Sequence, residues 1–242
     1  MNINFDTDNL IIVFYPGLAG GKFLINCLGL SDDVVFQDHQ LAQKQLDLKF
    51  SQQDKINYLL DKLAETVEWN DYPEVYGWND LDLGCMELFG ISNSDYVQLS
   101  SDEIRNLQFN DVITTLSNSS KKFFIVAHWP NNVARYLTVW PNAKLITFKN
   151  YSKFINFRIH DRIKENVYIP MSDEMPNNYN EVITKFSDQM QLWDTDWYFD
   201  EKDTIAGIKN LYQSLNLSNF NEKAITSYYT AWINKLKELK TK

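Results

Sequence analysis

The sequence predicts an α/β fold in which helices flank a central, mostly parallel sheet, and three observations lead to this prediction. Short apolar runs at residues 10–15, 122–127 and 144–148 have the length and composition of strands buried on both faces. Segments with helical patterns separate these runs. Strands that alternate with helices form right-handed βαβ units, and such units build a parallel sheet.

The chain is expected to form a single domain over residues 1–242, with one variable insertion. Its 242 residues, 44% of them hydrophobic, suffice for one large domain or two small ones. No internal repeat or low-complexity linker divides the sequence. Residues 70–95 are rich in Gly, Trp, Asp and aromatic side chains, so we expect irregular structure there and place the variable insertion at residues 70–100.

Three helices and one further strand are expected in the N-terminal half. A short helix begins at Lys22, and another is expected over residues 102–116. Residues 32–36 are a candidate for a short second strand. The clearest helix covers residues 51–69, where Ser51 can cap the first turn and apolar side chains recur on one stripe: Ile56, Leu59, Leu60, Leu63 and Val67.

The C-terminal half continues the alternation of strands and helices. Residues 170–179 contain two prolines and are expected to form a loop, whereas residues 197–199 resemble a short strand. Helices are expected at residues 131–139, 151–163, 181–193, 204–215 and 221–239.

The charge and cysteine content exclude several classes of protein. The chain has 23 basic and 32 acidic residues and a net charge of −9, whereas nucleic acids and anionic membranes require a basic surface. Cys27 and Cys85 form neither a disulfide framework nor a metal-binding spacing, which suits a reducing compartment. No segment approaches the length of a membrane span. We therefore expect a cytoplasmic protein with neither nucleic acid nor membrane among its partners; the sequence indicates no oligomeric state.

The most informative segment is the glycine-rich turn after the first strand. The strand ends at Tyr15 and Pro16, and an apolar helix follows Lys22. Glycines let backbone amides approach a phosphate, the helix N-terminus presents free N–H groups, and a lysine adds positive charge. A plain turn between a buried strand and a helix is the alternative. The residues expected to bind phosphate are Gly17, Leu18, Ala19, Gly20, Gly21, Lys22 and Phe23.

Two other strands end in residues that can act on a ligand. His128 follows the run at 122–127, where it can accept a proton near neutral pH or simply support the turn before Pro130. Lys149 ends the run at 144–148 and is either an anion contact or part of a solvated basic helix face. Ligands bind beyond the carboxyl ends of parallel strands, so Tyr15, His128 and Lys149 all point to one edge of the sheet.

The order of these features resembles the sulfotransferase family, a branch of the P-loop fold. That family's first motif, roughly Tyr-Pro-Lys-Ser-Gly-Thr-Thr-Trp, corresponds to residues 15–23 of this chain. Its second motif, Lys-Thr-His-Leu-Pro, is similar to residues 126–130, Val-Ala-His-Trp-Pro. Its third, Arg-Asn-Pro, corresponds to Lys149, Asn150 and Tyr151. The resemblance covers most of the chain in layout and implies a P-loop-type three-layer fold.

The resemblance also implies a reaction. Members of the family transfer a sulfuryl group from 3′-phosphoadenosine-5′-phosphosulfate, and no metal is expected. By the same resemblance, His128 is the base that removes a proton from a hydroxyl or amine of a small-molecule or glycan acceptor, and Lys22 offsets charge on the leaving oxygen. Additional contacts to the donor are implied for Lys149, Asn156 and Arg158.

The motifs also depart from the family pattern, and two other functions remain open. Gly17, Val126 and Lys149 replace the family's first-motif lysine, the lysine before the catalytic histidine and the phosphate-binding arginine. A P-loop kinase or nucleotide-binding protein is one alternative, although Phe23 stands where Ser or Thr would hold magnesium. A non-catalytic protein that keeps the fold for binding is the other.

Overall fold

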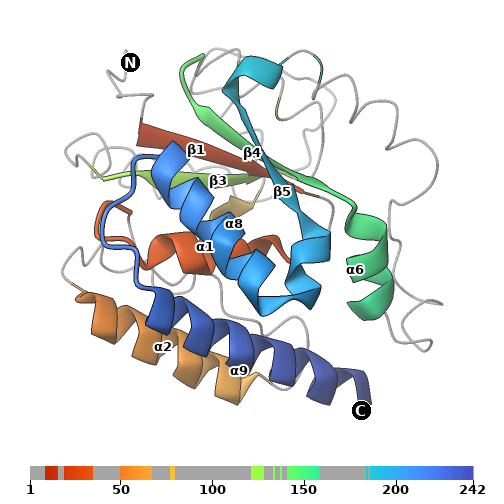
Figure 1. The fold of residues 1–242 in the computed structure, drawn as a ribbon. Coiled ribbons are helices and arrows are strands. Elements are labelled where there is room, and N and C mark those ends of the chain that lie inside the picture. Colours follow the sequence, from red (N-terminus) through yellow and green to blue (C-terminus); the bar gives the residue numbers. More distant parts are fainter. Residues whose placement is uncertain are drawn as a thin grey trace, which may run out of the picture.

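A parallel five-stranded sheet forms the centre of the molecule (Figure 1). The computed structural model describes residues 9–15, 19–34, 50–66, 77–79, 121–127, 133, 137, 141–158, 184 and 186–241. The strand order is β2-β3-β1-β4-β5, and all four neighbouring pairs are parallel. The predicted α/β fold is thereby confirmed. The strands are β1 (Leu10–Phe14), β2 (Gly77–Asn79), β3 (Phe123–Ala127), β4 (Lys144–Lys149) and β5 (Met190–Asp194).

The first strand occupies the middle of the sheet because its side chains are apolar on both faces. All five residues of β1 are fully buried. It pairs with β3 on one side and β4 on the other, and Phe14 lies opposite both Ala127 and Thr147. An apolar run without alternation is typical of a strand that is covered on both faces. The three strands recognised in the sequence are therefore the three central strands.

Helices pack against this sheet in two layers (Figure 1). In the view of Figure 1, α1 lies between the sheet and the paired helices α2 and α9, while α8 crosses in front of the strands. The described helices are α1 (Gly21–Gly29), α2 (Gln52–Glu65), α6 (Tyr151–Arg158), α8 (Glu201–Ser214) and α9 (Glu222–Thr241), with two short 3₁₀ helices, η4 (Ser187–Gln189) and η5 (Thr195–Phe199). Each of the five longer helices confirms a prediction from the sequence, with its ends shifted by a few residues.

Polar side chains fix where these helices begin. The Ser51 hydroxyl accepts the backbone N–H of Asp54, whose carboxylate accepts the backbone N–H of Ser51, and this reciprocal pair starts α2. Asp200 accepts the N–H groups of Lys202 and Asp203 and starts α8. In none of the described helices are length and hydropathy together sufficient to cross a bilayer.

The structure corrects two predictions in the C-terminal half. Residues 187–193, predicted to be helical, form η4 and most of β5, and residues 197–199, predicted to be a strand, lie in the 3₁₀ helix η5. The apolar side chains of Phe186, Met190 and Trp193 recur at helical spacing, and that periodicity was misleading. Pairing with β4 overrides it and draws the segment into the sheet.

Smaller differences concern the N-terminal half. Gly77–Asn79 pairs with β3 inside the region expected to be irregular. The candidate strand at residues 32–36 is described only up to residue 34, and in this part Val34 alone makes a sheet-like bridge, to Lys122. Within the predicted helix at residues 131–139, Val133 and Leu137 are helical and buried. The predictions for residues 102–116 and 170–179 lie outside the described residues.

Candidate functional site

The carboxyl ends of β1, β3 and β4 meet at one edge of the sheet, as the sequence predicted. Phe14, Ala127 and Thr147 are register partners, and the backbone N–H of Tyr15 donates to the Ala127 carbonyl at 3.1 Å. His128 follows Ala127 directly in the chain but lies outside the described residues. The residues that follow β1, β3 and β4 in the chain therefore start from neighbouring strand ends.

The glycine turn leads into α1 through a left-handed residue. Gly20 is the N-cap of α1. Its backbone has φ 84° and ψ 15°, a conformation that residues other than glycine rarely adopt. A Cβ at Gly20 would also lie 2.8 Å from Cε2 of Tyr198. The turn thus needs glycine here for its backbone angle and for its packing. Residues 16–18, which include Gly17 and Leu18, lie outside the described residues.

Gly21 lets the backbone rest directly on an aromatic ring. A Cβ at this position would lie 2.1 Å from Cε1 of Tyr15, which no real contact allows. Tyr15 is itself 3% exposed and packs against Phe148, with the ring centroids 5.2 Å apart. The ends of β1 and β4 and the start of α1 therefore form one tightly packed unit.

The start of α1 has the electrostatic character of an anion site. The first amides of a helix have no carbonyl partner within it, and the helix dipole places partial positive charge there. Lys22 is partly buried. It is the second residue of α1, so its positive charge lies at the same end of the helix. Ala19, Gly20 and Gly21 are buried. The described part of the turn therefore brings backbone donors and one lysine together.

Phe23 fills a different role from the one its position would have in a magnesium-binding loop. Its side chain is fully buried and stacks on Trp232, with the ring centroids 4.0 Å apart, and on Tyr228, at 5.6 Å. Tyr198 meets its edge at 5.6 Å. The ring anchors the first turn of α1 in an aromatic cluster and offers no oxygen to a metal ion.

Tyrosine hydroxyls from the C-terminal half hold α1 at both ends. Tyr198 Oη donates to the Gly20 carbonyl at 2.9 Å, and Tyr212 Oη donates to the Cys27 carbonyl at 2.9 Å. Both hydroxyls are buried, and burial raises the pKa of Tyr212 well above its ordinary value, so this tyrosine remains a donor. In the sequence these residues signal only a core position; their partners are set by the tertiary fold.

The bond from Tyr198 fixes the orientation of a peptide that faces the turn. In a trans peptide the C=O and the following N–H point in opposite directions. Because Tyr198 Oη and the backbone N–H of Phe23 both donate to the Gly20 carbonyl, that carbonyl is held inward. The N–H of Gly21 in the same peptide consequently points away from these two donors.

The opposite end of α1 is capped by a buried lysine. Lys55 on α2 is 2% exposed, and its Nζ donates to the carbonyls of Gly29 at 3.2 Å and Ser31 at 2.5 Å. Asp32 Oδ1 lies 3.9 Å from the same nitrogen. Burial lowers the pKa of Lys55 to about 8, and the negative charge of Asp32 opposes this shift. A cation at a helix C-terminus is favourable, and here it also occupies carbonyls that the helix leaves open.

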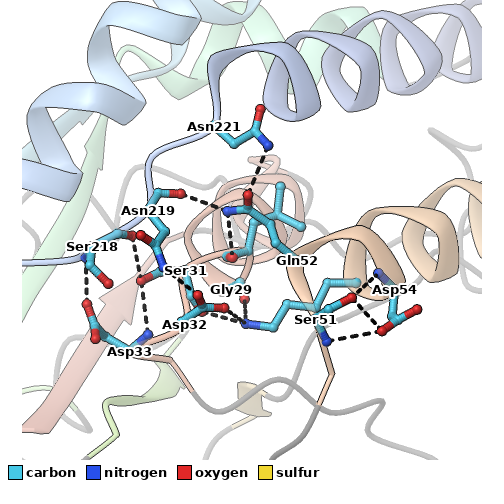
Figure 2. Close-up of polar contacts among 12 residues, drawn as sticks. Gly29, Ser31, Asp32, Asp33, Ser51, Gln52, Asp54, Ser218, Asn219 and Asn221 are labelled. Atoms are coloured by element: carbon cyan, nitrogen blue, oxygen red, sulfur yellow. Dashed lines mark hydrogen bonds and ion pairs between the residues drawn. The ribbon is translucent and has the colours of Figure 1, made fainter.

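The connection between α8 and α9 completes this polar cluster (Figure 2). Figure 2 shows Ser218, Asn219 and Asn221 facing the turn after α1 and the start of α2. Asn219 Nδ2 donates to Asp32, and Gln52 Nε2 donates to the Asn219 carbonyl at 2.7 Å. Asn221 Nδ2 donates to Gln52 Oε1 at 2.9 Å. The end of α1 is thus tied to segments nearly two hundred residues away.

The third strand end carries an acidic partner that the sequence did not reveal. Lys149 Nζ lies 3.2 Å from Asp194 Oδ2, and the two residues are register partners at the ends of β4 and β5. Asn150, which has φ 59°, donates from Nδ2 to both carboxylate oxygens of Asp194 at 3.0 Å. Asp194 follows the segment predicted to be a helix, and nothing in its local pattern indicates that it ends a strand.

The remaining predicted contacts lie on α6. Asn156 is exposed on this helix, and Arg158 is its last residue, with a side chain outside the described set. Lys153 pairs with Asp196 at 3.1 Å. Over the described residues, no cluster of three or more His, Cys, Asp or Glu side chains is arranged to hold a metal ion.

Comparisons with known proteins give one likeness. No protein-family model matches the chain, and no curated protein matches it. Among solved structures, it is similar to the crystal structure of sulfotransferase STF1 from Mycobacterium tuberculosis H37Rv (type1 form), with 15% sequence identity and a TM-score of 0.49. The match covers 99% of this chain and 77% of that chain. The residues at the carboxyl edge, rather than this likeness, carry the proposal that follows.

Proposed function

We propose that this chain, as a single domain, binds 3′-phosphoadenosine-5′-phosphosulfate and transfers its sulfuryl group to a hydroxyl or amine. The observation that carries the proposal is the start of α1 at the centre of the sheet edge. There, left-handed Gly20, close-packed Gly21 and partly buried Lys22 form the described part of a phosphate cradle. Tyr198 donates to the Gly20 carbonyl, so the Gly21 N–H of the same peptide points away from Tyr198.

The residues around this cradle favour sulfuryl transfer over transfer from a magnesium nucleotide. A P-loop NTPase holds magnesium with a Ser or Thr beside the loop lysine and an Asp on a neighbouring strand. Phe23 follows Lys22 here, and its ring is stacked in the core. The neighbouring strand β3 ends at Ala127 and is followed by His128. A histidine, which can act as a base, therefore follows this strand in place of the aspartate that would hold magnesium.

The proposed step is an in-line displacement at sulfur. The acceptor oxygen or nitrogen forms a bond to sulfur while the bond from sulfur to the bridging oxygen breaks. His128 takes the acceptor proton, and 3′-phosphoadenosine-5′-phosphate leaves with the bridging electron pair. Loop amides and Lys22 stabilise the charge that develops on the leaving group, and such positioned charges lower the barrier without reorganisation. The acceptor is proposed to be a small molecule or a glycan.

The first experiment is thermal unfolding with candidate ligands. We expect 3′-phosphoadenosine-5′-phosphate at a hundred times its Kd to stabilise the protein by about 2.7 kcal/mol, and ATP with magnesium to have no such effect. Lys22→Ala should weaken nucleotide binding about tenfold to a hundredfold because it removes a charge-assisted contact. Lys237→Ala is the control, since Lys237 is an exposed lysine on α9. Stabilisation by ATP and magnesium alone would instead support a kinase.

Turnover tests the second half of the proposal. Loss of a general base typically slows a reaction by a hundredfold to ten-thousandfold, so His128→Ala should lose most activity while it retains nucleotide binding. The measurement is sulfuryl transfer to an acceptor library, alongside calorimetric binding of 3′-phosphoadenosine-5′-phosphate. Tight nucleotide binding without transfer to any acceptor would indicate a protein that keeps the fold for binding only.

A further inference from the structure

Helix α9 contacts the segments that follow two strand ends, although α1 separates it from the sheet in the view of Figure 1. Trp232 is buried and stacks on Phe23 of α1, with the ring centroids 4.0 Å apart. It also meets the ring of Tyr198 in η5 at 5.0 Å. Tyr229, three residues earlier on α9, is buried and donates from Oη to the backbone carbonyl of Tyr198 at 2.9 Å. Since α1 follows β1 and η5 follows β5, one helix touches both segments.

Two buried hydroxyls act in series between α9 and the glycine turn. Tyr229 Oη holds the backbone of Tyr198, and Tyr198 Oη holds the Gly20 carbonyl, each at 2.9 Å. The preceding carbonyl, that of Trp197, accepts from Thr204 Oγ1 of α8 at 2.6 Å. Burial raises the pKa of Tyr229, so its hydroxyl remains a donor at neutral pH. Two consecutive carbonyls of η5 are thus fixed by hydroxyls from α8 and α9.

The ring contacts of Tyr198 do not by themselves fix its hydroxyl. Four aromatic rings of the described residues surround that of Tyr198, with centroids 4.6 to 5.6 Å away: Phe23, Phe154, Trp193 and Trp232. Aromatic pairs are favourable over separations of about 4.5 to 7 Å, whereas a hydrogen bond between oxygens holds only over about 2.5 to 3.0 Å. A small shift of the η5 backbone, which the rings would tolerate, would therefore weaken the bond to Gly20.

We propose that Tyr229 is a positioning residue for the glycine turn: from α9 it fixes the backbone of Tyr198, and Tyr198 in turn fixes the peptide between Gly20 and Gly21. The consequence for ligand binding rests on the proposed function, because this peptide belongs to the proposed phosphate cradle. Tyr229 acts through Tyr198 and not by contact with the nucleotide. Its effect on affinity is therefore limited to that of Tyr198.

The test is Tyr229→Phe, which keeps the ring and removes the hydroxyl. Calorimetry should show that 3′-phosphoadenosine-5′-phosphate binds about threefold more weakly to this variant than to the wild type, and no more weakly than to Tyr198→Phe. Tyr228→Phe is the matched control on α9, because it removes a buried hydroxyl that accepts from Asn26 Nδ2 at 2.7 Å and leaves the bonds to Tyr198 and Gly20 in place. It should bind the nucleotide as the wild type does, and equal losses in Y228F and Y229F would overturn the proposal.

A double variant tests whether Tyr229 acts through Tyr198. The protein with both Tyr198→Phe and Tyr229→Phe should bind the nucleotide as Tyr198→Phe alone does, because the bond that Tyr229 supports is already lost. Losses that add in the double variant would show that Tyr229 reaches the site by another route, and the proposal would be wrong.

A measurement without any nucleotide separates this inference from the proposed function. Labelling of glycine with ¹⁵N gives backbone amide NMR signals for eight residues, among them Gly20 and Gly21. These two signals should shift in Y198F and Y229F and stay in place in Y228F. If they do so but no nucleotide binds to the wild type, the proposed function is wrong and the positioning role of Tyr229 stands. If the nucleotide binds to the wild type but Y229F changes neither the signals nor the affinity, the proposed function stands and the role of Tyr229 does not.

Discussion

The two ends of α1 are held by the same kind of contact but differ in what they leave open. At each end a buried tyrosine donates to a backbone carbonyl at 2.9 Å, Tyr198 to Gly20 and Tyr212 to Cys27. At the C-terminal end, Lys55 also occupies the carbonyls of Gly29 and Ser31. At the N-terminal end, Tyr198 Oη and the Phe23 N–H both donate to the Gly20 carbonyl, and the Gly21 N–H points away from them.

This difference separates a structural end of a helix from a functional one. Carbonyls left open at a buried helix end cost stability, and the fold supplies Lys55 to satisfy them. At the other end, Tyr198 fixes the Gly20 peptide so that the Gly21 N–H points away from Tyr198 and Phe23, and a helix N-terminus of this kind favours an anion. Substitutions at the two ends should therefore have comparable effects on stability but different effects on ligand binding.

The largest expected effect is that of Gly21→Ala. The new Cβ would lie 2.1 Å from the ring of Tyr15, so either the ring or the start of α1 must move. We expect a loss of about 3 kcal/mol in the free energy of unfolding, at the upper end for overpacking, together with loss of nucleotide binding. Urea denaturation and calorimetry measure the two effects.

A double-mutant cycle checks that the ring is the cause. Tyr15→Leu removes the atoms that the new methyl group would strike, so the double variant should be more stable than the sum of the two single losses. Additive losses would place the strain of Gly21→Ala somewhere other than Tyr15.

Lys55→Met comes next and should affect stability alone. Methionine fills a similar volume but leaves the carbonyls of Gly29 and Ser31 without their donor, and we expect a loss of about 2 kcal/mol in the free energy of unfolding. Nucleotide affinity should match that of the wild type, because the proposed phosphate cradle lies at the other end of α1. A fall in affinity as large as that of Lys22→Ala would contradict the separation of the two ends.

The same variant gives a prediction about pH. The pKa of Lys55 is about 8 in the folded protein and 10.5 for an ordinary lysine, as in the unfolded chain. Between these two pH values the unfolded state therefore binds more protons than the folded state. The free energy of unfolding attributable to Lys55 therefore rises with pH across this window. The difference in stability between the wild type and Lys55→Met should widen from pH 8 to pH 10, and a difference that stays constant or narrows would show that Lys55 is not destabilised by burial of its charge.

The smallest effect gives the sharpest comparison. Tyr198→Phe and Tyr212→Phe each remove one buried hydroxyl that donates to α1 at 2.9 Å, so each should cost about 1 kcal/mol of stability. Only Tyr198→Phe removes a donor from the Gly20 carbonyl, and only this variant should bind 3′-phosphoadenosine-5′-phosphate more weakly, by about threefold to tenfold. Equal affinities in the two variants would mean that the loop keeps its shape without Tyr198.

The central strands and the turn could be predicted from the sequence because their signals are local. β1, β3 and β4 are apolar runs, and the glycines stand where the backbone needs φ > 0 or close contact with a ring. The start of α2 is marked by Ser51 and Asp54, which form its capping box and lie within four residues of each other. The three strands and the start of α2 depend on neighbours in the chain, and these predictions were confirmed, whereas phosphate binding by the glycine turn stays a prediction.

The features that were missed depend on partners far away in the chain. β5 has a helical spacing of apolar residues, and only its pairing with β4 makes it a strand. The role of Asp194 depends on its contacts with Lys149 and Asn150. The role of Lys55 depends on carbonyls more than twenty residues earlier in the chain. A periodic pattern indicates which face of a segment is buried, but it does not indicate which other segment that face packs against.

The anchors of α1 have a consequence for biosynthesis. Helix α1 leaves the ribosome well before Tyr198, Tyr212 and Tyr228, which bond to it across 178, 185 and 202 residues of sequence. Contacts of such long separation form late and slow the folding of a domain. The glycine turn therefore cannot reach its final shape during synthesis of the first half of the chain, and a nascent protein should acquire nucleotide binding only after its C-terminal helices have been made.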